Sequence, residues 1–115
     1  YDKDKLSGNS KYNSDSAIGT LFEGYSICSG YTDTLAIFLS KIGIDNVRVA
    51  NNSHTWNALL INNEWKHIDL TWDDPITTNN SDVIIYDYYL ISSKDITKKN
   101  EKEHYYSINV YDFLK

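Results

Sequence analysis

Residues 54–75 read HTWNALLINNEWKHIDLTWDDP, and this stretch decides the fold. It holds two β-like runs, 54–61 and 64–70, joined by two asparagines, a residue type that tolerates the positive φ of a tight hairpin turn. A turn centred between positions 62 and 63 pairs position i with position 125 − i. This register places Asp69 near Trp56, about one diagonal step from His54 on the neighbouring strand. The second run should end at Asp73-Asp74-Pro75, because proline cannot donate to a strand ladder.

The segment before this hairpin has the apolar spacing of a helix. Its apolar side chains recur at intervals of three and four residues, at Tyr31, Leu35, Phe38, Leu39 and Ile42. Such a pattern indicates an amphipathic helix that buries this face. We expect its first turn near residues 28–30 and its end at Gly43, in a left-handed cap.

The remaining segments carry weaker signals. The sequence predicts a polar lead-in over residues 1–20 that packs by Tyr1 and Tyr12, strands at 46–50 and 83–91, a polar loop at 77–81, a helical turn plus loop at 92–102, and a last short strand or tail at 108–114. There is no internal repeat and no sign of a domain boundary. The expected class is therefore α+β, with one main helix packed against an antiparallel sheet.

Length and charge exclude several classes of protein. The 115 residues suffice for one domain, 1–115, and because the chain begins with Tyr1 rather than Met we interpret it as an excised or partial domain of a longer protein. The net charge of −5, with no lysine or arginine cluster, argues against nucleic-acid and anionic-membrane binding. No apolar run approaches the roughly 20 residues that span a bilayer, so we expect no membrane insertion.

The single cysteine, Cys28, excludes an internal disulfide and a multi-thiolate metal site within one chain. A thiol at a helix start, next to an imidazolium, has a lowered pKa and becomes a nucleophile. His54 could supply that imidazolium, and Asp69 could fix its tautomer and orientation. These residue types would support acyl transfer through a thioester. The types alone also fit a buried cysteine that acts as a small apolar side chain.

Three sequence blocks lead to a family. Residues 24–31 read GYSICSGY, residues 54–57 read HTWN, and residues 65–75 read WKHIDLTWDDP. In this order and at these distances they resemble the transglutaminase-like superfamily in its bacterial form, which has a G-x-C-x-G-Y stretch, an H-A-W-N stretch and a W-x-x-[VI]-D-x-T-W-D-D-P stretch. The resemblance spans about residues 19–75. It implies a papain-like fold, with a catalytic helix packed against an antiparallel sheet, and a triad of Cys28, His54 and Asp69.

The resemblance also implies a function. Members of this superfamily perform cysteine acyl transfer on amide bonds of peptides or proteins, by transamidation or hydrolysis, without a cofactor. Peptide, protein or cell-wall peptide substrates are expected, and an extracellular or cell-envelope location by family analogy. An alternative is a catalytically silent module that binds a peptide or cell-wall fragment in the same cleft, rimmed by Tyr25, Trp56 and Trp72. Trp56 and Trp72 also have a second interpretation, in which they pack the wall of the site rather than contact a ligand.

Three details depart from the family pattern. Thr55 replaces the usual alanine after His54, and Ile18 stands where relatives often carry an aromatic residue. The chain contains no glutamine, so a papain-type side-chain oxyanion donor is absent. The N–H of Cys28 is one expected oxyanion donor. A further backbone N–H, Tyr12 or Asn13 could be the second.

Other polar residues have plainer interpretations. His67 shares a strand face with Asp69 and could join the site, although a surface or core-edge position is the commoner case. His104 is expected to be exposed in a loop. A zinc site built from Cys28, His54, His67 and His104 lacks a ligand spacing, so no metal is expected. The pair Asp73 and Asp74 is interpreted as a strand-ending turn rather than as paired catalytic carboxylates.

Overall fold

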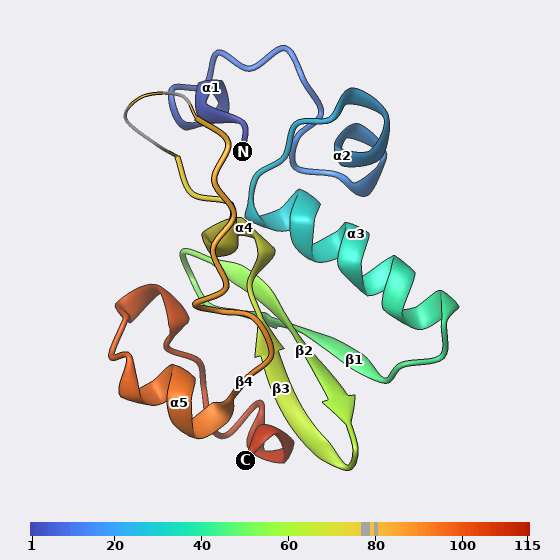
Figure 1. Cartoon of the computed structure of the whole chain (residues 1–115), viewed down its shortest axis with the longest axis vertical. Helices are drawn as coiled ribbons and strands as arrows, with labels where there is room; N and C mark the ends of the chain where they lie inside the picture. Colours follow the sequence, from blue (N-terminus) through green and yellow to red (C-terminus); the bar gives the residue numbers. More distant parts are fainter. Residues whose placement is uncertain (77–78, 80) are drawn as a thin grey trace.

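The computed structural model describes residues 1–76, 79 and 81–115, and it is a mixed helix and sheet structure of the α+β class (Figure 1). Its antiparallel sheet has the strand order β1-β2-β3-β4. The strands are β1 (Asn46–Ala50), β2 (Thr55–Ile61), β3 (Glu64–Ile68) and β4 (Ile91–Ser92). The helices are α1 (Lys3–Leu6), α2 (Ala17–Glu23), α3 (Cys28–Lys41), α4 (Leu70–Asp73) and α5 (Ser93–Lys98), with 3-10 turns η1 (Lys102–His104) and η2 (Asp112–Leu114). In the part of the chain that the structure describes, no helix is both long and apolar enough to cross a membrane.

The central hairpin has the predicted register. Asn57 pairs with Ile68 and Ile61 pairs with Glu64, so every pair follows the 125 − i rule. Asn62 and Asn63 form the turn with φ values of 51° and 64°. The returning strand is shorter than expected: it ends at Ile68 and does not continue to the Asp-Asp-Pro segment. Asp69 leaves the ladder to cap α4, where its side chain accepts a hydrogen bond from the N–H of Trp72.

Helix α3 has the predicted bounds, and Gly43 follows it with a φ of 78°. The predicted buried face was only partly correct, since Phe38 is 50% and Ile42 is 69% exposed while Leu39 is buried. The helix packs on the sheet with Leu35 and Leu39, and near its start it also approaches the sheet with small and polar residues. The hydroxyl of Thr32 donates to the carbonyl of Thr55 at 3.1 Å, and the amide of Asn57 donates to the carbonyl of Thr32 at 3.0 Å. These two bonds fix the start of α3 against β2.

The sheet is covered on both faces, and residues of β2 alternate between them. Leu59 faces α3 and packs with Leu39 and Ile68. Trp56 and Ala58 face the other way, into a cluster completed by the C-terminal third of the chain. That cluster also contains Val49, Tyr88, Ile96 and Leu114. The chain after β4 therefore forms the second cover of the sheet (Figure 1).

Several weaker predictions were wrong. The lead-in expected over residues 1–20 contains α1 and the start of α2, each stabilised by a side-chain cap from Asp2 or Ser16. The strand expected at 83–91 is reduced to β4, because its backbone bonds to Asp73 instead of to a strand: Ile85 N–H donates to the Asp73 carbonyl and Tyr88 N–H to the Asp73 carboxylate. Of the two alternatives for 108–114, a short strand or a tail, the strand is wrong, because the segment forms turns and η2. Positions 77, 78 and 80 of the expected polar loop lie outside the described residues.

Candidate active site

Cys28 is the first residue of α3, and its thiol is half-buried. The preceding cap residue is Ile27, which provides no side-chain hydrogen bond, so the first N–H groups of the helix are not capped by a side chain. The pKa of the Cys28 thiol is lowered, chiefly by a hydrogen bond with the His54 side chain, which outweighs the opposing effect of burial. The backbone N–H groups of Thr55 and Ser29 also face the sulfur and stabilise its thiolate. The local environment therefore favours a nucleophilic sulfur.

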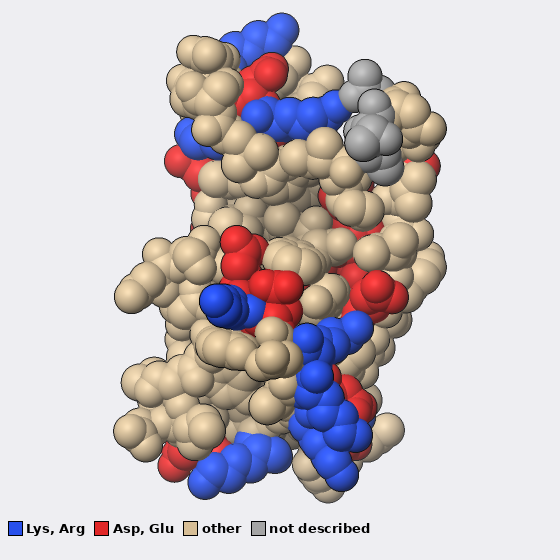
Figure 2. All heavy atoms as spheres, turned by 90° about the vertical axis from the view of Figure 1, so that its left-hand side faces the viewer, with Lys and Arg blue, Asp and Glu red and all other residues tan. Residues whose placement is uncertain are grey.

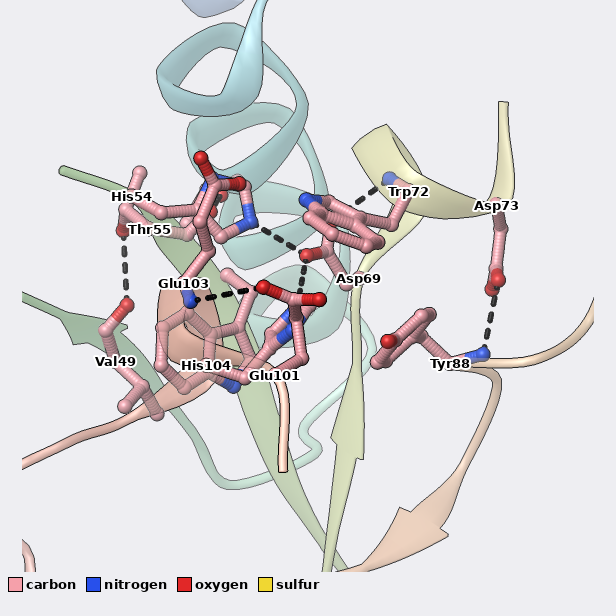
Figure 3. Close-up of polar contacts among 12 residues, drawn as sticks. Val49, His54, Thr55, Asp69, Trp72, Asp73, Tyr88, Glu101, Glu103 and His104 are labelled. Carbon is pink, nitrogen blue, oxygen red and sulfur yellow. Dashed lines mark hydrogen bonds and ion pairs between the residues drawn. The ribbon is translucent and has the colours of Figure 1, made fainter. Parts of the chain in front are cut away.

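His54 lies in the connection between β1 and β2 and joins the other two residues of the predicted triad. Its Nε2 is 2.5 Å from Oδ2 of Asp69 (Figure 3). Burial would lower the pKa of His54, but hydrogen bonds with Asp69 and Cys28, together with their negative charges, raise it to about 9. The imidazolium form is thus stabilised between a carboxylate and a thiolate.

Asp69 follows β3 directly and is only 2% exposed. Burial would raise the pKa of this carboxyl group, but hydrogen bonds from His104 and His54 and from the N–H of Trp72 lower it. Its own N–H donates to the carbonyl of Tyr88 at 3.0 Å. The carboxylate is therefore ionised and held in one orientation.

The sulfur and the imidazole open onto a pocket of about 370 Å³. Its wall includes Cys28, His54 and Trp72, and it carries two carboxylates, Asp74 and Glu103. Figure 2, viewed from the side of α1 and α5, shows acidic side chains grouped near the middle of this face. Because Cys28 lines the pocket, a substrate group that enters it can reach the thiol.

The structure separates the three proposed cleft residues. Trp72 lines the pocket. Trp56 is 1% exposed and stacks near the His54 ring, with a centroid distance of 5.8 Å, so it packs the inner wall of the site. Tyr25 stacks on Tyr12, with a centroid distance of 4.0 Å, outside the set of residues that line the pocket.

The two side chains considered as second oxyanion donors are engaged elsewhere. Tyr12 is stacked on Tyr25, and Asn13 donates through both its backbone and its side chain to Glu23. Of the three expected sources of a second oxyanion donor, a backbone N–H therefore remains. The N–H of Ser29 is a candidate, because it faces the sulfur at the N-terminal end of α3.

His67 is buried and belongs to a separate chain of hydrogen bonds. Its Nδ1 accepts from the indole N–H of Trp56 at 3.0 Å, and its Nε2 lies 3.0 Å from the hydroxyl of Ser93. Burial, followed by the charge of His104, lowers the pKa of His67 to about 4. His67 is therefore a neutral connection between the sheet and α5.

His104 was expected to be exposed, and that prediction was wrong. The side chain is buried, and its Nε2 lies 2.7 Å from Oδ2 of Asp69. It reaches Asp69 from η1, 35 positions further along the chain. Sequence reasoning missed it because no motif surrounds it and its position depends on how the C-terminal segment folds back.

The paired acids Asp73 and Asp74 have separate structural partners. Asp73 is buried and accepts from the N–H of Tyr88, and burial raises the pKa of its carboxyl group. Asp74 accepts a hydrogen bond from the hydroxyl of Tyr31. Each acid thus has a partner distant in sequence, and Asp73 is the last residue of α4 rather than part of a strand-ending turn.

Among the described residues, His54, Asp69 and His104 form a group that could hold a metal ion, with ligand atoms within 4.8 Å of one another. Ligands about 2.0–2.2 Å from a tetrahedral zinc lie about 3.3 Å apart. Here the two N···O distances are 2.5 and 2.7 Å, which are hydrogen-bond distances. The arrangement therefore fits a hydrogen-bonded network better than a metal centre.

Compared with protein-family models and with curated protein sequences, the chain matches none of either.

Proposed function

We propose that this chain is a cysteine-dependent acyl-transfer enzyme that acts on amide bonds of peptides or proteins. The observation that carries the proposal is the arrangement of Cys28, His54 and the buried Asp69 at an open pocket, in which His54 lies 2.5 Å from Asp69 and lowers the pKa of the Cys28 thiol. The resemblance of three sequence blocks to the transglutaminase-like superfamily supports the same reading, and with it a papain-like core.

The first half-reaction forms a thioester. The Cys28 thiolate attacks the amide carbonyl, and the negative charge moves to the carbonyl oxygen. N–H groups at the start of α3 face this position and stabilise the oxyanion. The proton held by His54 passes to the amide nitrogen, the C–N bond breaks, and the amine leaves.

The second half-reaction releases the acyl group. Water or a second amine attacks the thioester carbonyl and gives its proton to His54. The C–S bond then breaks and the thiolate is restored. Asp69 remains ionised throughout; it stabilises the imidazolium whenever His54 is protonated and orients the ring while His54 is neutral in the thioester intermediate.

The first test uses p-nitrophenyl acetate as an acyl donor. Wild-type protein is expected to release nitrophenol and gain one acetyl group on Cys28, read by intact mass, whereas Cys28→Ala should do neither. The chain has a single cysteine, so an acetyl group that wild type gains and Cys28→Ala does not gain lies on Cys28. His54→Ala should slow acylation while leaving the protein folded, as measured by circular dichroism.

Amide chemistry needs a separate measurement. Casein with blocked amino groups would report hydrolysis through new amino groups and transamidation through incorporation of a fluorescent primary amine. Either product, absent with Cys28→Ala, supports the proposal. Absence of both products contradicts it, and slow acylation equal to that of a denatured control would favour a binding module in the same pocket.

A further inference from the structure

A second imidazole donates to the catalytic carboxylate. Oδ2 of Asp69 lies 2.5 Å from Nε2 of His54 and 2.7 Å from Nε2 of His104 (Figure 3). The side chains of Asp69 and His104 are each 1% exposed, so the second bond is shielded from water. The acyl-transfer steps above make no use of it.

The His104 ring is fixed by aromatic neighbours. Tyr88 stacks on it with centroids 4.4 Å apart, and Trp72 and Trp56 meet its edges at 4.9 and 5.1 Å. Among the described residues, Nδ1 of His104 is buried with no hydrogen-bond partner. An unpaired buried nitrogen costs free energy. The ring is therefore aimed at Asp69 even though this leaves its other nitrogen unsatisfied.

One amide side chain fixes the backbone of both histidines. Nδ2 of Asn51 donates to the carbonyls of Glu103 and Tyr105, at 2.7 and 2.8 Å, on either side of His104. Oδ1 of Asn51 accepts from the N–H of His54 at 2.9 Å. The C-terminal segment is thus bound to the same residue that holds the catalytic histidine.

We propose that His104 is a positioning residue that holds the Asp69 carboxylate ionised and directed at His54, with Asn51 setting the spacing of the two histidines. This inference rests on the proposed function. A buried carboxylate that loses one of its donors becomes easier to protonate and free to rotate. The imidazolium of His54, and with it the Cys28 thiolate, would then be less stable.

Other ionisable groups also face this cluster from the surrounding elements. They are Tyr1, Cys28 of α3, His67 of β3, Asp73 of α4, Tyr88, and Glu101 and Glu103 beside His104. The test therefore compares variants of His104 alone, so that these groups stay constant.

The experiment measures the rate of Cys28 alkylation by iodoacetamide against pH in His104→Leu and His104→Gln. Leucine removes the donor, whereas the glutamine amide can place an N–H near the position of Nε2. We expect His104→Leu to raise the midpoint of labelling by about one pH unit, a tenfold loss of thiolate below the midpoint. His104→Gln should restore most of that loss. Thermal melting checks that both variants fold.

The outcomes separate this inference from the proposed function. Wild-type labelling only above about pH 8, as for a free thiol, would overturn both. Acidic labelling by wild type with an unchanged His104→Leu profile overturns the role of His104 alone. A His104→Gln profile equal to that of His104→Leu shows that ring packing, not the donor, matters, and also overturns it.

A measurement on the wild-type protein covers the case in which the variants do not fold. Nitrogen-15 NMR of the imidazoles should find a proton on Nε2 of His104 throughout the pH range in which Cys28 labels rapidly. A His104 with a bare Nε2 cannot donate to Asp69 and overturns the inference.

Discussion

Replacing Asp69 with asparagine removes one buried charge and keeps the size of the side chain. The pKa of His54 lies at about 9, against an ordinary value of 6.5, which corresponds to about 3 kcal/mol in favour of the imidazolium. The hydrogen bond with Asp69 is the largest contribution that raises this pKa. A hydrogen bond to a charged group contributes about 1.5–3 kcal/mol. We therefore expect Asp69→Asn to reduce the thiolate–imidazolium population about tenfold to a hundredfold.

The assay is the pH profile of iodoacetamide labelling, followed by intact mass. Labelling of wild type should persist well below pH 7, and the Asp69→Asn profile should move toward that of a free thiol. Turnover should fall further than labelling, because the asparagine also disturbs the tautomer of His54.

A matched control is Asp73→Asn, four residues further along in α4. Asp73 is also buried, and it accepts from the N–H of Tyr88 rather than from a histidine. It should leave the labelling profile within a few tenths of a pH unit of wild type. If Asp69→Asn folds and labels as wild type does, the reasoning about the site is refuted.

Three further predictions concern stability, measured by urea unfolding. The pKa of His67 is about 4 in the folded chain against 6.5 ordinarily, so the unfolded chain binds the proton more readily. The free energy of unfolding should therefore fall by up to about 3 kcal/mol between pH 6.5 and 4. His67→Gln should flatten this dependence on pH. Gly30→Ala should destabilise by about 1–3 kcal/mol, because its Cβ would lie 2.3 Å from the carbonyl oxygen of Ser14; unchanged stability would mean that this contact relaxes freely. Arg48→Ala should cost less than about 1 kcal/mol, because its ion pair with Asp33 is exposed, and a larger loss would show that the pair is coupled to the core.

The sequence predicted the parts of the fold that depend on local chemistry. The asparagine turn determines the register of β2 and β3, and Gly43 ends α3 in a left-handed conformation. The short helices α1 and α2 were missed, because helices of this length depend on caps and packing rather than on apolar periodicity. The apolar run at 83–91 formed only the short strand β4, since Asp73 provides bonding partners for its backbone.

The residues of the candidate site also divide into those that local sequence patterns predict and those that they do not. Cys28 at a helix start and His54 across a hairpin from Asp69 follow from local patterns, and the structure brings the three together. His104 does not follow from any pattern, and neither does the burial of Trp56 or the displacement of Tyr25 from the pocket.

The sequence by itself determined the hairpin and the main helix, and with them the positions of Cys28, His54 and Asp69. Turn residues, helix caps and strand register act over only a few positions, which is why they can be read locally. Only the tertiary structure decided that the C-terminal segment covers the sheet and inserts His104 between Tyr88 and the tryptophans. The resulting hydrogen bond between His104 and Asp69 joins two residues that are 35 positions apart. It depends on the packing of side chains from separate elements, for which no short-range signal exists.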